Sequence, residues 1–93
     1  MIKALVIDKK DNVGVVIEPG IKGDKVIYKV NENIEKTTLL TNIPIYHKFA
    51  IIDINKGNPI IKYGEHIGLA AQDIKKGEHI HEHNIESHRE VLK

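Results

Sequence analysis

The chain has 93 residues, of which 14 are Lys or Arg and 13 are Asp or Glu, and it contains no Cys. A chain of this length buries only about 60 to 65% of its unfolded surface, so we expect one modest core in a single domain over residues 1–93. The near balance of charge argues against a nucleic-acid-binding surface, and we expect no nucleic-acid partner. The lack of Cys excludes disulfides and thiolate metal sites and predicts a cytoplasmic protein.

Short apolar runs dominate the chain. The first run is closed by Asp8, which predicts a first strand and neither a signal peptide nor a membrane span. The later runs are rich in β-branched residues and bounded by Gly, Pro, Asn and Asp, so turns interrupt each run before a helical period can form. This pattern predicts a mostly β fold. The expected strands are Lys3–Ile7, Asn12–Ile17, Lys25–Val30, Ile34–Leu40, Lys48–Asp53, Pro59–Lys62, His66–Ala71 and Glu78–Asn84.

The C-terminal tail, Ile85–Lys93, differs from the rest of the chain. It has a weak helical pattern and contains Ser, His and Glu. An isolated helix of this length is not stable in water, so we expect a partner to order the tail.

One short pattern recurs four times: an acidic or amide residue, Ile, a turn that usually contains Gly, and then an apolar strand. Complete copies begin at Asp53 and Asp73, the copy at Asn42 lacks the Gly, and a truncated copy begins at Ile21. In each copy the Asp or Asn side chain can accept hydrogen bonds from nearby backbone N–H groups, Ile can fill the core, and Gly can adopt a positive φ. The copies are too short and irregular for a solenoid, so they predict repeated corners in a strongly bent β domain.

Histidines are concentrated near the C-terminus, where His79, His81 and His83 alternate. In a strand, alternation would place all three on one face with neighbouring Cα atoms about 6.5 to 7 Å apart, close enough for two imidazoles to share a metal ion or an anionic substrate. His81 and His83 are therefore candidate metal ligands. A zinc site normally needs a third ligand, which His47 or His66 could supply only if the fold brings them near. The alternative is a solvated or interfacial strand face.

Two lysines are candidates for binding a carboxylate. His47 and Lys48 precede Phe49, which we expect in the core. A base beside a cation suits a carboxylate substrate, because the cation neutralises the anion while the imidazole moves a proton. Lys62, at the end of a strand, could clamp a carboxylate. The alternatives are surface roles for His47 and Lys48 and packing over an aromatic ring for Lys62. The Asn84 amide could bond either a turn or a substrate hydroxyl.

The sequence contains no nucleophile elbow, phosphate-binding glycine loop, His-Glu-x-x-His helix or dinucleotide fingerprint, so on its own it does not describe an enzyme. Four ordered segments within residues 11–84 nevertheless resemble one family, the altronate and galactarate dehydratases. They are Asp11-Asn12-Val13, Ile43-Pro44-x-x-His47-Lys48-Phe49-Ala50, Lys56-Gly57-x-Pro59-Ile60-Ile61-Lys62-Tyr63-Gly64-x-x-Ile67-Gly68 and Asp73-Ile74-x-x-Gly77-x-x-Ile80-His81-x-His83-Asn84.

The resemblance is to the SAF domain of these enzymes, which in some organisms is a small subunit beside a large catalytic one. It implies a compact β-clip fold and a hydro-lyase that removes water from a sugar acid, with iron or another divalent metal held mainly by the large subunit. It also implies that the catalytic residues are His47, Lys48 and His81 and that the substrate-binding residues are Lys62, His83 and Asn84. Two positions depart from the family: Tyr46 replaces a usual Gly, which affects the turn that presents His47, and His79 stands where the family varies.

Several hypotheses about function stay open. A related branch removes sulfite from sulfolactate with a similarly small subunit. Both reactions take a proton from the carbon beside a carboxylate and a group from the next carbon, which requires carboxylate neutralisation, a base and a Lewis acid. Two further hypotheses are a non-catalytic β-clip module that binds a sugar acid or a protein partner, and a free-standing histidine metal protein.

Overall fold

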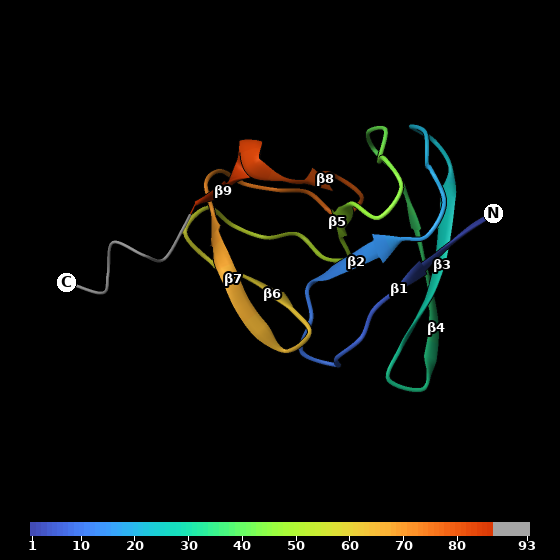
Figure 1. The fold of residues 1–93 in the computed structure, drawn as a ribbon, viewed down its shortest axis with the longest axis horizontal. Coiled ribbons are helices and arrows are strands. Elements are labelled where there is room, and N and C mark those ends of the chain that lie inside the picture. The colour runs from blue at the N-terminus through green and yellow to red at the C-terminus, as the bar shows by residue number, and fades with distance from the viewer. Residues whose placement is uncertain (87–93) are drawn as a thin grey trace.

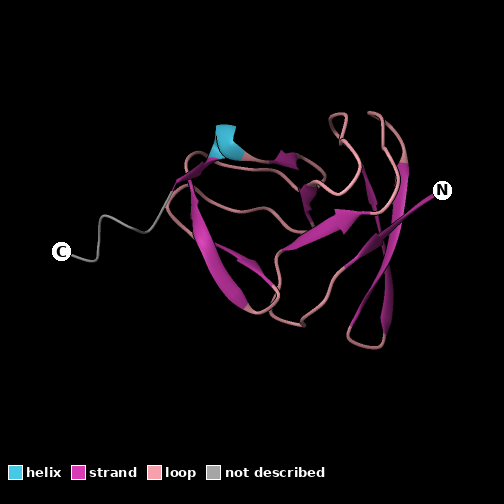
Figure 2. Ribbon diagram, viewed as in Figure 1, coloured by secondary structure: helices cyan, strands magenta, loops and turns pink. Residues whose placement is uncertain are grey.

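The computed structural model describes residues 1–86 and shows a mostly β domain (Figures 1 and 2). This confirms the predicted fold class. The described elements are β1 (Ile2–Leu5), β2 (Val13–Val16), β3 (Lys25–Val30), β4 (Asn33–Thr38), β5 (Lys48–Ala50), β6 (Pro59–Lys62), β7 (Glu65–Ala70), β8 (His79–Ile80), the 3-10 helix η1 (Glu82–Asn84) and β9 (Ile85–Glu86). No helix within residues 1–86 is long and apolar enough to cross a membrane.

The described strands form two sheets. The larger has the order β4-β3-β1-β2-β5-β8, and the smaller has the order β6-β7-β9. Within this part of the chain every strand pair is antiparallel except β1 with β3, which run parallel. The β3–β4 hairpin lies at one end of the molecule, and β6 and β7 lie at the other (Figure 1). The short strands β5 and β8 lie between these ends.

Two apolar clusters form the core. The first lies around Val16, Val26 and Phe49, and the second around Ile60 and Ile80. The Phe49 ring is fully buried and meets the Tyr28 ring edge-on, with 5.7 Å between ring centroids. This confirms Phe49 as a core anchor. Ile80 is also fully buried, so β5 and β8 are both anchored in the core by apolar side chains that flank the histidines.

The four recurring corners are β-turns with a left-handed third residue. In each turn the fourth residue donates its backbone N–H to the carbonyl of the first; the pairs are Asp24 to Ile21, His47 to Pro44, Asn58 to Asn55 and Glu78 to Lys75. The third residue has φ between 68° and 95° and is Gly23, Tyr46, Gly57 or Gly77. Such a turn favours Gly at this position because other residues are strained there. The predicted positive φ at the Gly positions is confirmed.

The corners associate in pairs. Ile43 exchanges two backbone hydrogen bonds with Gly20, and Ile54 exchanges two with Ile74. All three isoleucines are at most 3% exposed, as expected for core residues. The sequence therefore predicts their burial correctly.

The acidic and amide side chains join the paired corners to each other. Asp53 accepts a hydrogen bond from the backbone N–H of Lys76, and Asp73 accepts one from Lys56, both at 2.8 Å. Asn42 accepts an equivalent bond from the N–H of Lys22. The predicted acceptor role is confirmed, but the donors lie in the partner corner instead of the local turn.

Most expected strand ends agree with the structure to within two residues, but two expected strands end three or four residues earlier than the sequence predicts. The expected strand Lys48–Asp53 ends at Ala50, where the chain leads into the next corner. The expected strand Glu78–Asn84 is reduced to His79–Ile80, because the following residues curl into η1. The expectation of three histidines alternating along one strand is therefore wrong.

The described start of the tail is also different from expectation. Ile85–Glu86 is a strand, not helix, and pairs with β7. Ile85 packs against the second core cluster. The expected role of the remaining tail falls on residues 87–93, which lie outside the described residues.

Tyr46 offers a direct test of the corner geometry. Its φ is 68° and its side chain is 69% exposed, so it is strained without much compensating packing. Removing the strain of the left-handed φ raises the free energy of unfolding by about 1 to 2 kcal/mol. The greater entropy that Gly gives the unfolded chain lowers it by about 0.5 to 1 kcal/mol. We expect Tyr46→Gly to raise the free energy of unfolding by about 0.5 to 1 kcal/mol in urea denaturation. Tyr46→Ala keeps the strain and is the control. A stabilisation as large in Tyr46→Ala would contradict the backbone explanation.

Candidate functional site

Three histidines meet where β5 and β8 pair. His47 precedes β5, His79 begins β8, and His81 follows β8. The antiparallel register places Lys48 opposite Ile80 and Phe49 opposite His79, so the start of β5 lies beside the end of β8. Segments that are about 32 residues apart in the sequence thereby contribute side chains to one group.

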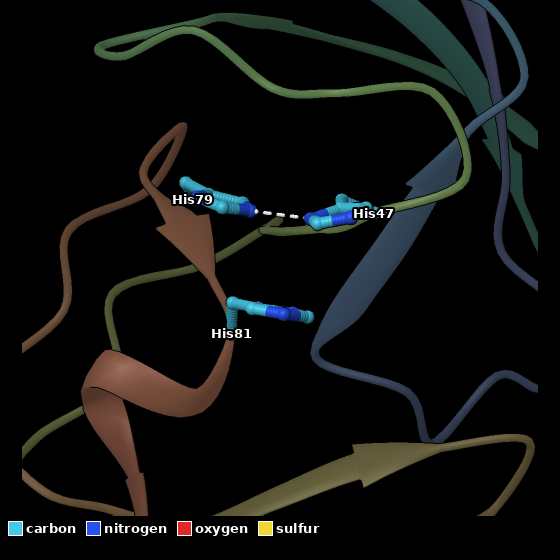
Figure 3. A group of neighbouring side chains, drawn as sticks. All are labelled: His47, His79 and His81. Atoms are coloured by element: carbon cyan, nitrogen blue, oxygen red, sulfur yellow. Dashed lines mark hydrogen bonds between the residues drawn. The ribbon is translucent and has the colours of Figure 1, made fainter.

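The imidazoles of this group are in contact (Figure 3). Nδ1 of His47 lies 2.9 Å from Nε2 of His79, within hydrogen-bonding distance. The ring of His47 also stacks on that of His81, with 4.4 Å between centroids and 23° between planes. One ring nitrogen from each of the three lies within 4.8 Å of the others. The fold thus brings His47 to His81, as the sequence-based hypothesis of a shared site requires, and it adds His79, which belongs to the alternating histidines of the sequence but to which the family resemblance gives no role. We call these three residues the histidine trio.

His83 lies at the edge of this group. It is in η1 and exposed, and its ring centroid is 5.3 Å from that of His79 at an angle of 39°. Because the chain curls after β8, His83 does not continue the row formed by His79 and His81.

Asn84 causes this curl. Its side chain is fully buried, accepts a hydrogen bond from the backbone N–H of His81, and donates one to the carbonyl of His79. The backbone N–H of Asn84 also donates to the carbonyl of His81. These contacts correspond to a turn-stabilising role, so we assign Asn84 to positioning the backbone that carries two members of the trio.

The two candidate lysines are close enough to influence each other. Burial lowers the pKa of Lys48 from its usual value, and the positive charge of Lys62 lowers it further. The ammonium group of Lys62 also lies 4.9 Å from the centroid of the Tyr63 ring, which agrees with packing over an aromatic ring. Lys48 and His81 line a depression of about 360 Å3 together with Ile67, Glu82 and Ile85. A depression that contains one cation, Lys48, and one carboxylate, Glu82, therefore adjoins the trio.

A larger cavity of about 500 Å3 is lined by a different set of residues, among them Lys9, Lys10, Asp11 and Asn12. Asp11 accepts hydrogen bonds from the backbone of Gly64 and Asp8, and the Asn12 amide bonds the backbone at positions 59 and 61. These side chains hold β2 against the smaller sheet, so the first of the four motifs is structural. We therefore place the candidate site at the trio.

Burial and nearby positive charge also act on His79. Its pKa falls from 6.5 to about 4, first because burial disfavours the charged ring and then because of the charges of His47, His83, His81 and Lys48. At neutral pH the His79 ring is thus uncharged and can donate or accept a hydrogen bond.

Comparisons with known proteins identify the family. The family described as "Altronate/galactarate dehydratase SAF domain" matches residues 2–88. The chain belongs to this SAF-domain family. The match covers the trio and both lysines, and it confirms the family that the sequence motifs resemble.

Relatives of this SAF domain carry the names of lyases. The chain is 35% identical over 85 residues to (2R)-sulfolactate sulfo-lyase subunit alpha of Chromohalobacter salexigens, covering 88% of this chain and 90% of that subunit. It is 40% identical over 74 residues to altronate dehydratase of Escherichia coli, covering 80% of this chain but 14% of that enzyme. For altronate dehydratase of Bacillus subtilis the identity is 38% and the coverage is 87% and 16%. This SAF domain thus corresponds to a small subunit in one relative and to a minor part of the chain in the others.

We expect Asn84→Ala to lower the free energy of unfolding by about 2 to 3 kcal/mol, because it leaves two partly buried backbone groups without partners and empties a buried site. The measurement is chemical denaturation, with His83→Ala as a neighbouring control that should change stability by less than about 0.5 kcal/mol. If Asn84→Ala were as stable as the parent, the positioning role of Asn84 would be wrong.

The lowered pKa of His79 predicts a pH dependence of stability. Between pH 6.5 and about 4 the unfolded chain binds a proton at this residue and the folded chain does not, so the free energy of unfolding falls as pH falls through this window. Partial exposure limits the expected loss to about 1 to 2 kcal/mol. Denaturation measured at about pH 7 and about pH 4.5 in the presence of a chelator should show this loss, and His79→Gln should reduce it. An equal loss of stability in the parent and in His79→Gln would refute the assignment of this pH dependence to His79.

Proposed function

We propose that this SAF domain completes the active site of a lyase whose larger catalytic chain is a separate partner. The supporting observation is the joint presence of the trio and the adjoining depression that contains Lys48 in a domain too small to enclose a substrate. His47, His81 and Lys48 are half-buried, so a partner chain could cover them and still leave them reachable by a substrate. The extent of the match to a sulfo-lyase alpha subunit also supports a separate small subunit.

The substrate class we propose is a hydroxylated carboxylic acid with a leaving group on a neighbouring carbon. A carboxylate beside Lys48 and Lys62 would reduce the repulsion between their charges and offset the burial of Lys48. Neutralising the carboxylate in this way makes the adjacent C–H more acidic. Sugar acids such as altronate and galactarate fit this description, and so does sulfolactate.

The imidazoles would handle the proton. In the proposed mechanism His47 or His81 accepts the proton from the carbon beside the carboxylate, or returns one to the departing group, as a general base or acid. Loss of such a group typically costs about two to four orders of magnitude in rate. The family resemblance implies iron or another divalent metal, held mainly by the larger chain, and this stays a prediction. The substrate-binding role of His83 and a cytoplasmic location also stay predictions.

Co-expression with a larger dehydratase or sulfo-lyase chain from the same genome tests the proposal. We expect both chains to copurify and lyase activity toward altronate, galactarate or sulfolactate to require both. Activity of the larger chain alone at the full rate would refute it, as would a stable complex that turns over none of these acids. The second outcome would instead indicate a non-catalytic binding or assembly module.

In the active complex, substitutions should separate the roles. We expect His47→Ala or His81→Ala to lower kcat about 100-fold or more, and Lys48→Met chiefly to raise KM, because a lost charge weakens carboxylate binding. His66→Ala, on β7 and outside the trio, is the matched control and should stay within about twofold. Equal small effects from all of these variants would mean that the trio and Lys48 are not at the active site.

A further inference from the structure

We propose that His47, His79 and His81 form a divalent transition-metal site on this chain itself. The three residues offer one ring nitrogen each, and these nitrogens lie within 4.8 Å of one another. The site differs from the pair His81 and His83 that the sequence suggests, because His83 lies outside the trio. It also lies on this domain, whereas the family resemblance places the metal mainly on a larger chain.

The spacing of the nitrogens suits a small metal ion. A tetrahedral centre with metal–nitrogen bonds of about 2.0 to 2.1 Å requires about 3.3 Å between ligand nitrogens. Nδ1 of His47 and Nε2 of His79 are 2.9 Å apart, slightly closer than this, and the trio spans at most 4.8 Å. Ring movements of about 1.5 Å or less therefore produce the required geometry. All three side chains are half-buried, so their rings have room for such rotations.

The backbone beneath the rings is already fixed. Phe49 and Ile80, which are fully buried, hold β5 and β8 in the core, and the pairing of these strands sets the spacing of the trio. The amide of Asn84 bonds the backbone of both His79 and His81. Ligands on a preorganised backbone lose little entropy when they bind an ion, which favours affinity.

The ligand type indicates which metals to expect. Imidazole nitrogens suit Zn2+, Co2+, Ni2+, Cu2+ and Fe2+, whereas Mg2+ and Ca2+ prefer oxygen ligands. Three protein ligands leave a fourth position open, as in catalytic zinc sites and unlike structural ones. His81 also lines the depression that contains Lys48 and Glu82, so the open position adjoins a cation that, together with the metal ion, outweighs the single carboxylate in attracting an anionic ligand. The site would therefore bind a metal ion and a small anion together.

The test uses the full chain without an affinity tag, freed of metal by a chelator. We expect isothermal titration with Zn2+ to show one ion bound per chain with a Kd in the micromolar range or below, and Mg2+ to show no binding. Co2+ should give the visible absorption bands of a low-symmetry, four-coordinate site. These measurements need no partner chain and no lyase activity. An imidazole that binds a metal ion has no free lone pair for a proton, so a bound ion would exclude the general-base role proposed for His47 and His81 and would leave the proposed roles of Lys48 and of the partner chain unchanged.

Single substitutions identify the ligands. We expect His47→Ala, His79→Ala and His81→Ala each to weaken Zn2+ binding by about 100-fold or more, whereas His66→Ala, the matched control, should bind as the parent does. Zn2+ should raise the midpoint of thermal unfolding of the parent and of His66→Ala but not of the trio variants. A cooperative unfolding transition of each metal-free variant shows that it is folded. Absence of stoichiometric Zn2+ binding by the parent would overturn the proposal. So would strong dependence on His83 with none on His47.

Discussion

The fold depends on the hydrogen bonds exchanged between paired corners. Ile54 and Ile74 exchange two backbone bonds at the centre of one pair, and Asp53 and Asp73 each accept a backbone N–H from the opposite corner. Each bond contributes only about 1 kcal/mol, but the two corners satisfy each other's polar groups reciprocally. A short chain can therefore turn sharply several times without leaving buried backbone groups unpaired.

The same corners position the chemically active residues. β5 begins directly after the corner that ends at His47, and β8 begins directly after the corner that ends at Glu78. Each corner thus delivers a histidine at the start of a strand, and the pairing of the two strands brings these histidines together. The buried amide of Asn84 then turns the chain so that His81 completes the group. The geometry of the site therefore follows from the backbone: the two corners and the turn at Asn84 together position its three side chains.

The sequence predicts much of this arrangement. The corners at Asp53 and Asp73, the buried Phe49 and the family follow from local patterns of turn and apolar residues. The membership of the trio does not, because it depends on the register between two strands far apart in the sequence, which local patterns do not encode. The alternation of His81 and His83 is misleading because a single side chain, Asn84, replaces the strand by a 3-10 turn. The alternating histidines of the sequence include His79, but its contact with His47 could have been predicted only by assuming that the two corner-to-strand segments pair.

The paired corners also limit how the chain can vary. Along a strand, one added residue displaces the residues after it by about 3.3 Å and moves their side chains to the opposite side of the sheet. An insertion between the corner that ends at Glu78 and β8 would therefore move His79 and His81 out of reach of His47 and would also displace Ile80 from the core. An insertion at the tip of the hairpin between β3 and β4, around Asn31, would leave the trio in place. Chain length should therefore be constrained beside the corners and free at the hairpin tip, whatever residues occupy either segment.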